Sequence, residues 1–346
     1  MTKQQRVWVL RALLFVGTLV SLWFVPWPMV LAWMPPLPAT VQEQVDRSLD
    51  YGFDGVVVYV DEAGQAPRVF TAGWHDRELA IPARGDAFFK IASISKLYDA
   101  VAITKLVSDE RISLDDTLAS HFPELTGRIE YADRITLRQM VQHRSGIPNF
   151  TDAPGFWANP PESAEAALAL ALDQPALFEP GEGYSYSNTN YFLLSELIKR
   201  ITGHDKHYFI EERVLDPLGL SSTHGSMHDV DPDDLMSGYY VGFDEDLKAN
   251  EDGSMVATAS DVAVFLRALN DGSVFDEGEQ EVYSSIYVYN HTGLIPGYQS
   301  IARYHADIDT VVVQFVSTTN FSGYTWGLSE LSYDRIIGIV KRSRAD

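Results

Sequence analysis

A serine and a lysine three residues apart are the first candidates for chemistry in this chain of 346 residues. Ser93 and Lys96 lie in AFFKIASISKLYDAVAI (87–103), where Lys96 is almost alone among apolar residues. Residues i and i+3 share one face of a helix, so the amine of Lys96 would stand beside the hydroxyl of Ser93. A desolvated lysine can take a proton from serine, because burial disfavours its charged form. A capping serine beside a snorkelling lysine explains the spacing equally well, so further residues must decide.

Two later stretches offer partners for this pair. FEPGEGYSYSNTNYFLLSELIKRITG (178–203) holds the only Tyr-x-Asn of the sequence, Tyr186-Ser187-Asn188, before an expected helix closed by Gly203. NHTGLIPGYQS (290–300) is expected to end one strand and to lead through Pro296-Gly297 into another. Each stretch alone has an ordinary structural explanation, Asn188 as an N-cap and Tyr186 as a core aromatic.

Taken in this order, the three motifs resemble those of the serine β-lactamase and penicillin-binding peptidase superfamily. The resemblance is to the branch that contains class C β-lactamases, D-alanyl-D-alanine carboxypeptidases and related esterases. MVQHRSGIPNF (140–150) and GSMVATASDVAVFLRAL (253–269) support it, and it extends over about residues 41–346. It implies a serine hydrolase that works through an acyl-enzyme and needs no cofactor.

The resemblance implies a role for each motif residue. Ser93 would attack a carbonyl carbon, and Lys96 and Tyr186 would share the proton transfers, either of them being the formal base. Asn188 would hold the amide of the acyl side chain and help to orient Lys96. These expectations make Ser93, Lys96 and Tyr186 the catalytic residues.

The third motif would complete the site. The backbone N–H groups of Ser93 and Leu294 would form the oxyanion hole, and His291, Thr292 and Gly293 would bind substrate. The β-lactamases of this branch carry lysine where this chain has His291, and histidine is only partly charged near neutral pH. This departure favours a carboxypeptidase or an esterase over efficient lactam hydrolysis.

These residues lead to one main functional hypothesis and two alternatives. We expect D-Ala-D-Ala carboxypeptidase-like or esterase activity on a small-molecule, peptide or ester substrate. A class C-like β-lactamase is the first alternative. A non-catalytic penicillin-recognising sensor or scaffold is the second alternative. All three motifs are intact in this chain, which counts against a scaffold without activity.

The elements that must position these residues indicate an α/β fold of the α+β type. Strand patterns occur in FDGVVVYVDEAG and RVFTAGW near the start, and in 283–293, 299–307 and 309–319 near the end. Helices are expected at 41–52, through the middle of the chain and at 326–343. We therefore expect one antiparallel sheet in which the first and last strands are neighbours, with an inserted, mainly helical lobe and a site between them.

The N-terminal segment differs from the remainder. Lys3, Arg6 and Arg11 precede an uncharged run at 12–34, long enough to span a bilayer. We expect 1–11 in the cytoplasm, 12–34 as a single-pass anchor in the inner membrane, 35–40 as a linker and 41–346 as the catalytic domain on the periplasmic side. A signal peptide cleaved near LPA (37–39) is the alternative.

Composition excludes some functions. The formal net charge is −22, which argues against a nucleic acid partner. There is no cysteine, so disulfides and thiolate metal sites are impossible. His224 and His228 lie in a loop-like stretch without an evident third ligand, so we expect no metal.

Overall fold

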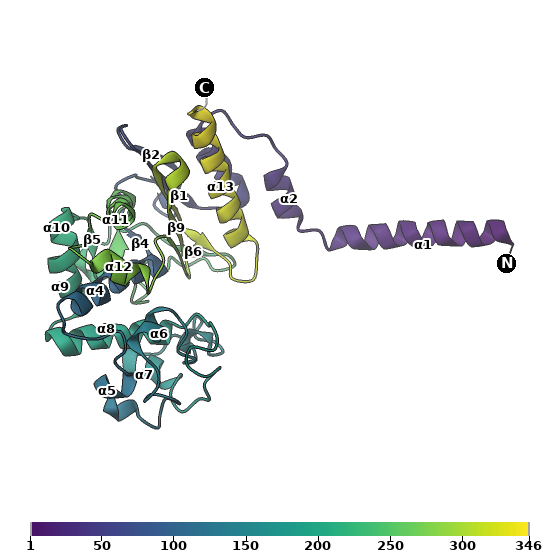
Figure 1. Cartoon of the computed structure of the whole chain (residues 1–346). Helices are drawn as coiled ribbons and strands as arrows, with labels where there is room; N and C mark the ends of the chain where they lie inside the picture. The colour runs from purple at the N-terminus through teal and green to yellow at the C-terminus, as the bar shows by residue number, and fades with distance from the viewer. Residues whose placement is uncertain (1, 345–346) are drawn as a thin grey trace.

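The computed structural model describes residues 2–344, which form one folded body and a helix that projects from it (Figure 1). A six-stranded antiparallel sheet, ordered β3-β2-β1-β10-β9-β8, is the centre of the body. Its strands are β1 Gly55–Glu62, β2 Arg68–Asp76, β3 Ile81–Pro82, β8 His291–Ile295, β9 Tyr298–His305 and β10 Thr310–Val316. The first long strand pairs with the last, β1 with β10, which confirms the expected sheet.

The sheet is buried on both faces because β1 alternates between two cores. Val56, Val58 and Val60 pack with helices α3 (Val41–Arg47) and α13 (Thr325–Ser343) on one side. Val57 belongs to the larger core on the other side, which includes α4 (Ser95–Ser108) and α11 (Ala259–Asp271). Side chains of a strand point alternately to opposite faces, so one run of valines serves both layers.

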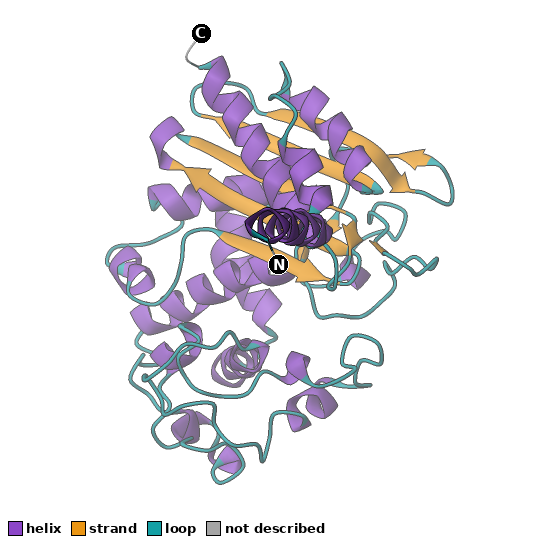
Figure 2. Cartoon of the chain, turned by 90° about the vertical axis from the view of Figure 1, so that its right-hand side faces the viewer, coloured by secondary structure: helices purple, strands orange, loops and turns teal. Residues whose placement is uncertain are grey.

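The remaining helices of the folded body form the inserted lobe, below the sheet in Figure 2, and the connections to it. They are α5 Leu118–His121, α6 Leu137–Val141, α7 Ala164–Ala169, α8 Asn188–Thr202, α9 Lys206–Ile210, α10 Asp216–Leu218 and α12 Glu279–Ser284. Short strands add a three-stranded sheet of β4 Phe89–Lys90, β7 Val256–Ala257 and β5 Thr223–His224, and a parallel pair of β11 Thr318–Thr319 and β6 Tyr239–Tyr240. The sequence patterns did not predict these small sheets.

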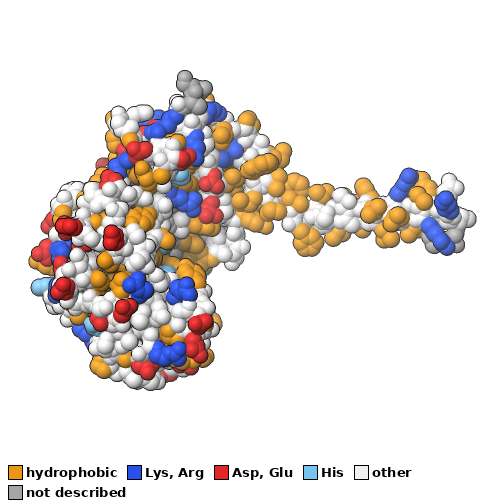
Figure 3. Space-filling view, in the orientation of Figure 1, with side chains coloured by type: hydrophobic (Ala, Val, Ile, Leu, Met, Phe, Trp, Pro, Cys, Tyr) orange, Lys and Arg blue, Asp and Glu red, His pale blue; other side chains and the backbone are white. Residues whose placement is uncertain are grey.

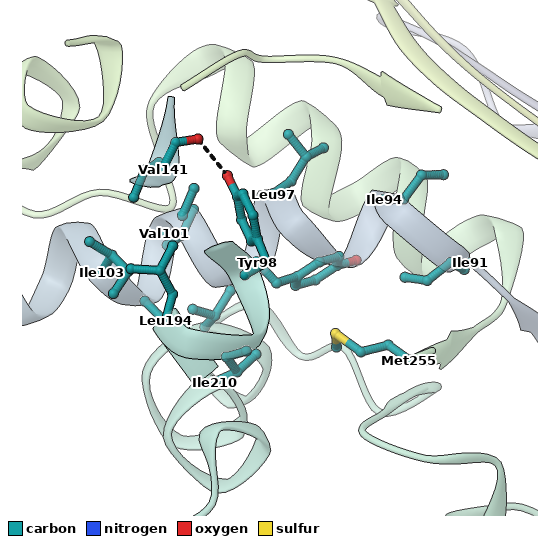
Figure 4. Close-up of a cluster of buried hydrophobic side chains, with 14 of the residues drawn as sticks. Ile91, Ile94, Leu97, Tyr98, Val101, Ile103, Val141, Leu194, Ile210 and Met255 are labelled. Atoms are coloured by element: carbon teal, nitrogen blue, oxygen red, sulfur yellow. Dashed lines mark hydrogen bonds between the residues drawn. The ribbon is translucent and has the colours of Figure 1, made fainter. Parts of the chain in front are cut away.

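Helix α4 runs through the larger core, as its apolar sequence predicts. Every residue from Ser95 to Leu106 is buried, and α8, α9 and α12 pack around it. Figure 4 shows its side chains among those of neighbouring elements, including Leu194 and Ile210. A rigid, buried helix therefore carries Lys96.

The predicted strand at 283–293 is wrong for its first part. Residues Glu279–Ser284 form α12 and a turn follows, so the strand β8 begins only at His291. Tyr283, Ile286 and Tyr287 have the i, i+3, i+4 spacing of a helical face, and this packing prevailed over the aromatic strand signal. Consequently, His291-Thr292-Gly293 starts a strand instead of ending one.

The apolar N-terminal run is divided into two helices. Helix α1 (Lys3–Trp23) is long and apolar enough to cross a membrane by length and composition, and it has no buried residue. Helix α2 (Trp27–Trp33) follows Pro26 and lies against α13. Apolar side chains cover α1 and the adjoining surface of the body (Figure 3). Such a helix points to a secreted or membrane location.

Candidate active site

Ser93 lies in a 3₁₀ turn, Ala92–Ile94, directly before α4. Ala92 has a φ of 49°, a left-handed conformation that costs an alanine about 1 kcal/mol. The turn is held by hydrogen bonds from the Ala92 N–H to Ser254 Oγ (2.8 Å) and from Ser95 Oγ to the Ala92 carbonyl (2.6 Å). This support fixes the direction of the Ser93 side chain.

The Ser93 hydroxyl meets the two expected partners. Tyr186 donates its hydroxyl hydrogen to Ser93 Oγ at 2.8 Å, and Lys96 Nζ lies 3.2 Å from the same oxygen. Lys96 Nζ also donates to Asn188 Oδ1 at 2.9 Å. The alternative roles do not apply: Ile94 occupies the N-cap position of α4, and Ser187 that of α8.

Lys96 is buried, with 8% of its surface exposed. Its ammonium group faces the rings of Tyr186 and Tyr191, 5.2 and 5.3 Å from their centroids. Within residues 2–344, no carboxylate lies within 4.0 Å of Nζ, and Asp99 one turn later is paired with Lys206. A hydroxyl, an amide oxygen and two aromatic rings therefore surround the amine.

Two residues that the sequence did not single out hold Asn188. Asn149 Oδ1 accepts the backbone N–H of Asn188 at 3.0 Å, and Asn188 Nδ2 donates to Thr151 Oγ1 at 3.0 Å. Thr151 lies in the 3₁₀ turn Phe150–Asp152, and Asn149, within the quoted stretch 140–150, is the N-cap of that turn. The side-chain amide of Asn188 is bonded to Thr151 through Nδ2 and to Lys96 through Oδ1, so its orientation toward Lys96 is fixed.

Strand β8 brings the third motif to Ser93. Gly293 is needed for this approach, because a Cβ there would lie 2.4 Å from the Ile91 carbonyl oxygen and 2.9 Å from Ala92 Cβ. Ser300 Oγ donates to the same carbonyl at 2.9 Å. Leu294 follows directly and lines the same cavity as Ser93.

His291 is half-buried at the cavity and contacts a hydroxyl. Its Nε2 lies 2.9 Å from the Tyr287 hydroxyl and its Nδ1 lies 2.5 Å from the Thr292 carbonyl oxygen. A proton on Nδ1 satisfies both contacts, since Tyr287 then donates to Nε2. Burial, and the nearby charge of Lys96, lower the pKa of His291 to about 4. His291 is thus neutral at pH 7.

His143 packs against the ring of Tyr186. Its ring stacks on that of Tyr186 with centroids 4.3 Å apart, and its Nδ1 accepts the Ser187 N–H at 3.1 Å. Burial, followed by the charges of Lys96 and His291, lowers its pKa to about 3. His143 therefore holds the backbone and the ring next to the site, and the sequence did not indicate its contact with Tyr186.

These residues line one side of a cavity of about 750 Å³. The motif residues that reach it are Ser93, Tyr186, Asn188, His291, Thr292 and Leu294. Trp157, Phe321, Tyr324 and Trp326 line it as well, and Met29 reaches it from α2. No lysine, arginine, aspartate or glutamate is among its lining residues within the described chain. Residues 2–344 contain no group of three potential metal ligands.

Comparison with known proteins gives a family match and several structural neighbours. The family model described as Beta-lactamase matches residues 37–285, which include Ser93, Lys96, Tyr186 and Asn188 but not His291. Protein flp of Staphylococcus aureus (strain MW2) is 25% identical over 190 residues, 53% of this chain and 38% of its own length. Penicillin-binding protein 4* of Bacillus subtilis is 24% identical over 267 residues, 69% of this chain and 57% of its own. This chain thus spans only part of these relatives.

The solved structures match almost the entire folded body. A D-amino acid amidase from Ochrobactrum anthropi SV3, complexed with L-phenylalanine, has a TM-score of 0.75 at 23% identity, covering 88% of this chain and 99% of its own. A penicillin-binding protein from Bacillus halodurans has a TM-score of 0.72 at 20% identity, with coverages of 87% and 99%. At these identities the likeness shows the fold. Together with the family match, it establishes that the chain belongs to the β-lactamase and penicillin-binding protein superfamily, a family of serine hydrolases that work through an acyl-enzyme.

Proposed function

We propose that this chain is an esterase or amidase that uses Ser93 as its nucleophile and prefers substrates without a free carboxylate. The single observation that carries the proposal is the contact of Ser93 Oγ with both Tyr186 and Lys96, on an uncharged cavity. D-Ala-D-Ala carboxypeptidase and β-lactamase substrates carry a carboxylate, for which the cavity lining offers no lysine or arginine.

In the proposed reaction, the site reacts from the state in which one member of the Lys96 and Tyr186 pair is unprotonated. That member takes the Ser93 proton while Ser93 Oγ attacks the carbonyl carbon of the substrate. Negative charge develops on the former carbonyl oxygen, which the N–H groups of Ser93 and Leu294 would stabilise. The same pair then returns the proton to the departing alcohol or amine. Water repeats these steps on the acyl-enzyme and releases the acid.

His291 supports the choice of substrate. A lysine at this position would supply a permanent charge for a carboxylate, whereas His291 is neutral at pH 7 and is held by Tyr287 and the Thr292 carbonyl. Thr292 still offers a hydroxyl to the cavity. A neutral hydrogen-bonding wall suits an ester or amide group and leaves a carboxylate without compensation.

Mass spectrometry of the full chain in detergent tests this function. The protein is mixed with a p-nitrophenyl ester, an amino acid amide, a D-Ala-D-Ala peptide or penicillin, and the mass of Ser93 peptides is followed over time. We expect rapid turnover of the ester or amide and slow reaction with the two carboxylates. Rapid turnover of the peptide or of penicillin would establish the carboxypeptidase or β-lactamase instead. Stable acylation without turnover would establish the sensor, and no acylation by any probe would contradict the proposal.

A further inference from the structure

The segment before the first core helix is tightly bound to the folded body. Arg335 of α13 donates to the carbonyl oxygens of Pro35 (3.0 Å) and Pro36 (2.9 Å) and to Gln44 Oε1 (2.8 Å). Arg342 lies about two turns further along the same face of α13 and donates to the Ala39 carbonyl at 3.3 Å. Residues 35–40, expected as a linker, therefore fix α2 to α13.

Helix α2 forms part of the cavity wall. Met29 lines the cavity and packs closely on Gly327, where a Cβ would lie 3.2 Å from Met29 Sδ and Cε. Ala32, on the same side of α2, is buried in the core that also contains Leu328. The helix next to the apolar N-terminus is thus a component of the candidate site.

The opposite side of α2 is apolar and exposed. Leu31 is 62% exposed, and Trp27, Trp33 and Met34 are exposed as well. No residue from 12 to 42 carries a charge. An uncharged helix with large aromatic residues on its outer side has the composition of a helix at the boundary between lipid and water.

The connection to α1 restricts where this surface can lie. Helix α1 has 21 residues, so it is about 31 Å long, which matches the hydrocarbon thickness of a bilayer. Only Phe24, Val25 and Pro26 separate it from α2, a connection of at most about 14 Å. If α1 spans a bilayer, α2 and the cavity beside it must lie at its surface. Figure 2 shows α1 end-on in front of the lower part of the sheet layer.

Aromatic residues extend this apolar surface around the cavity. Trp157 of the helical lobe meets Phe321 of the sheet lobe, with ring centroids 5.9 Å apart. Phe321 in turn meets Tyr240 at 5.5 Å, and its backbone N–H donates to the Tyr240 hydroxyl at 3.1 Å. Phe321 and Tyr324 are 40% and 49% exposed. The two lobes together present an apolar rim next to α2.

We propose that the exposed side of α2 lies in the surface of a lipid bilayer and that the cavity takes an ester or amide with a long apolar chain directly from that bilayer. The substrate would place its chain along Met29 and the aromatic rim and its carbonyl group at Ser93. This inference rests on the proposed hydrolase function for its substrate, but the membrane contact of α2 does not depend on it. The net charge of −22 opposes an anionic bilayer surface, so the contact would depend on the apolar side chains of α2.

A single-cysteine label tests the membrane contact. The chain has no cysteine, so Leu31→Cys provides a unique site for an environment-sensitive fluorophore on the full chain in phosphatidylcholine vesicles. The control is Val264→Cys, at an exposed apolar position of α11, on the other side of the sheet. We expect a spin-labelled lipid to quench the fluorophore at residue 31 and not at residue 264. Absence of quenching at residue 31 would overturn the proposal.

A pair of esters tests the route of the substrate. Leu31→Glu should lower kcat/KM for p-nitrophenyl palmitate in vesicles about tenfold and leave that for soluble p-nitrophenyl butyrate unchanged, because Leu31 does not line the cavity. Val264→Glu should change neither value. Equal effects of Leu31→Glu on both esters, or none on either, would contradict direct entry from the bilayer.

The two proposals fail in distinguishable ways. Hydrolysis of the butyrate ester without hydrolysis of the palmitate ester would leave the serine hydrolase function standing and reject the lipid-borne substrate. Failure of both esters and of all amide probes would reject the esterase or amidase function. The fluorescence measurement would then still decide whether α2 contacts lipid.

Discussion

Two buried lysines on helix α4 have opposite surroundings. The Nζ of Lys105 lies 2.8 Å from Glu279 Oε2, and the two side chains are 4% and 1% exposed. Lys96 is equally enclosed, but its contacts are the Ser93 hydroxyl and the Asn188 amide oxygen. Lys90, just before α4, is paired with Asp252 at 2.9 Å. Where a buried lysine serves the fold, a carboxylate compensates its charge; beside Ser93, none of the described residues does.

This difference indicates that Lys96 serves proton transfer and not the stability of the fold. A carboxylate partner would stabilise the charged amine and hold its proton in place. A hydroxyl and an amide oxygen orient the amine and leave the proton exchangeable with Ser93. The cost of this arrangement falls on stability, because a buried charge without an opposite charge is unfavourable. The first expectation is therefore that Lys96 can be replaced with little harm to the fold, and Lys105 cannot.

The largest effect should follow from removing the group that Lys96 serves. Ser93→Ala should lower hydrolysis by at least about 10³-fold and abolish covalent labelling by a fluorophosphonate, because no nucleophile remains. Ser95→Ala is the matched control. The Ser95 hydroxyl donates to the Ala92 carbonyl and is not the expected nucleophile, so the Ser95→Ala variant should still be labelled at Ser93. Peptide mapping of the labelled chain makes the measurement. Labelling of the Ser93→Ala variant at Ser95 would refute the assignment.

Replacing each lysine by methionine tests the comparison directly. Lys96→Met should slow acylation by about 10²-fold or more, with an unchanged or raised Tm, because it removes a proton acceptor and an uncompensated charge. Lys105→Met should leave acylation within a fewfold of wild type and destabilise the fold by about 3 kcal/mol, since Glu279 is left buried without its partner.

Stopped-flow acylation and urea unfolding of the two variants provide the data. Lys105→Met combined with Glu279→Gln should recover part of the lost stability, whereas no change near Lys96 is expected to need such compensation. Acylation within a fewfold of wild type for Lys96→Met would show that its position beside Ser93 is structural.

A smaller effect is expected from the tyrosine that shares Ser93 with Lys96. Tyr186→Phe removes the hydroxyl that donates to Ser93 Oγ and should slow acylation by about 10-fold to 10²-fold. The Lys96→Met and Tyr186→Phe double variant should lose less than the product of the single losses, because the two groups act on one proton. Single-turnover kinetics of the four proteins measures this coupling. Losses that simply multiply would show independent roles.

The last expectation concerns stability at acidic pH. His291 and His143 are neutral in the folded chain, with pKa values of about 4 and about 3, and an unfolded histidine has a pKa of about 6.5. The unfolded chain therefore binds protons first, so stability is full above about pH 6.5 and declines as pH falls toward 4. The limiting slope is about 1.4 kcal/mol per pH unit for each histidine.

Urea unfolding between pH 4.5 and 7 checks this slope. His291→Asn should reduce it, because this variant removes a histidine whose pKa is lowered in the folded chain. Lys96→Met should also reduce it, because the charge of Lys96 contributes to lowering the pKa of both histidines. An identical slope in all variants would contradict the neutral state of His291.

The sequence alone determined most of the long strands and helices and the motif residues of this protein. Runs of valine predicted β1 and β10, and the nearly all-apolar surface predicted the burial of α4, because both signals are local in the sequence. The same is true of the i, i+3 spacing that places Lys96 beside Ser93. Tyr186 and Asn188 came from a resemblance of motifs, and the structure brings both to the Ser93 and Lys96 pair.

Only the tertiary structure decided what surrounds these groups. The carboxylate of Glu279 at Lys105, the hydroxyl of Tyr287 at His291 and the side chain of Met29 in the cavity wall come from distant or misassigned segments. Periodicity gives no information on such contacts, since they depend on how whole elements pack and not on the spacing of residues within one element. For the same reason, the sequence showed that Lys96 is buried but not that it lacks a carboxylate partner among the described residues.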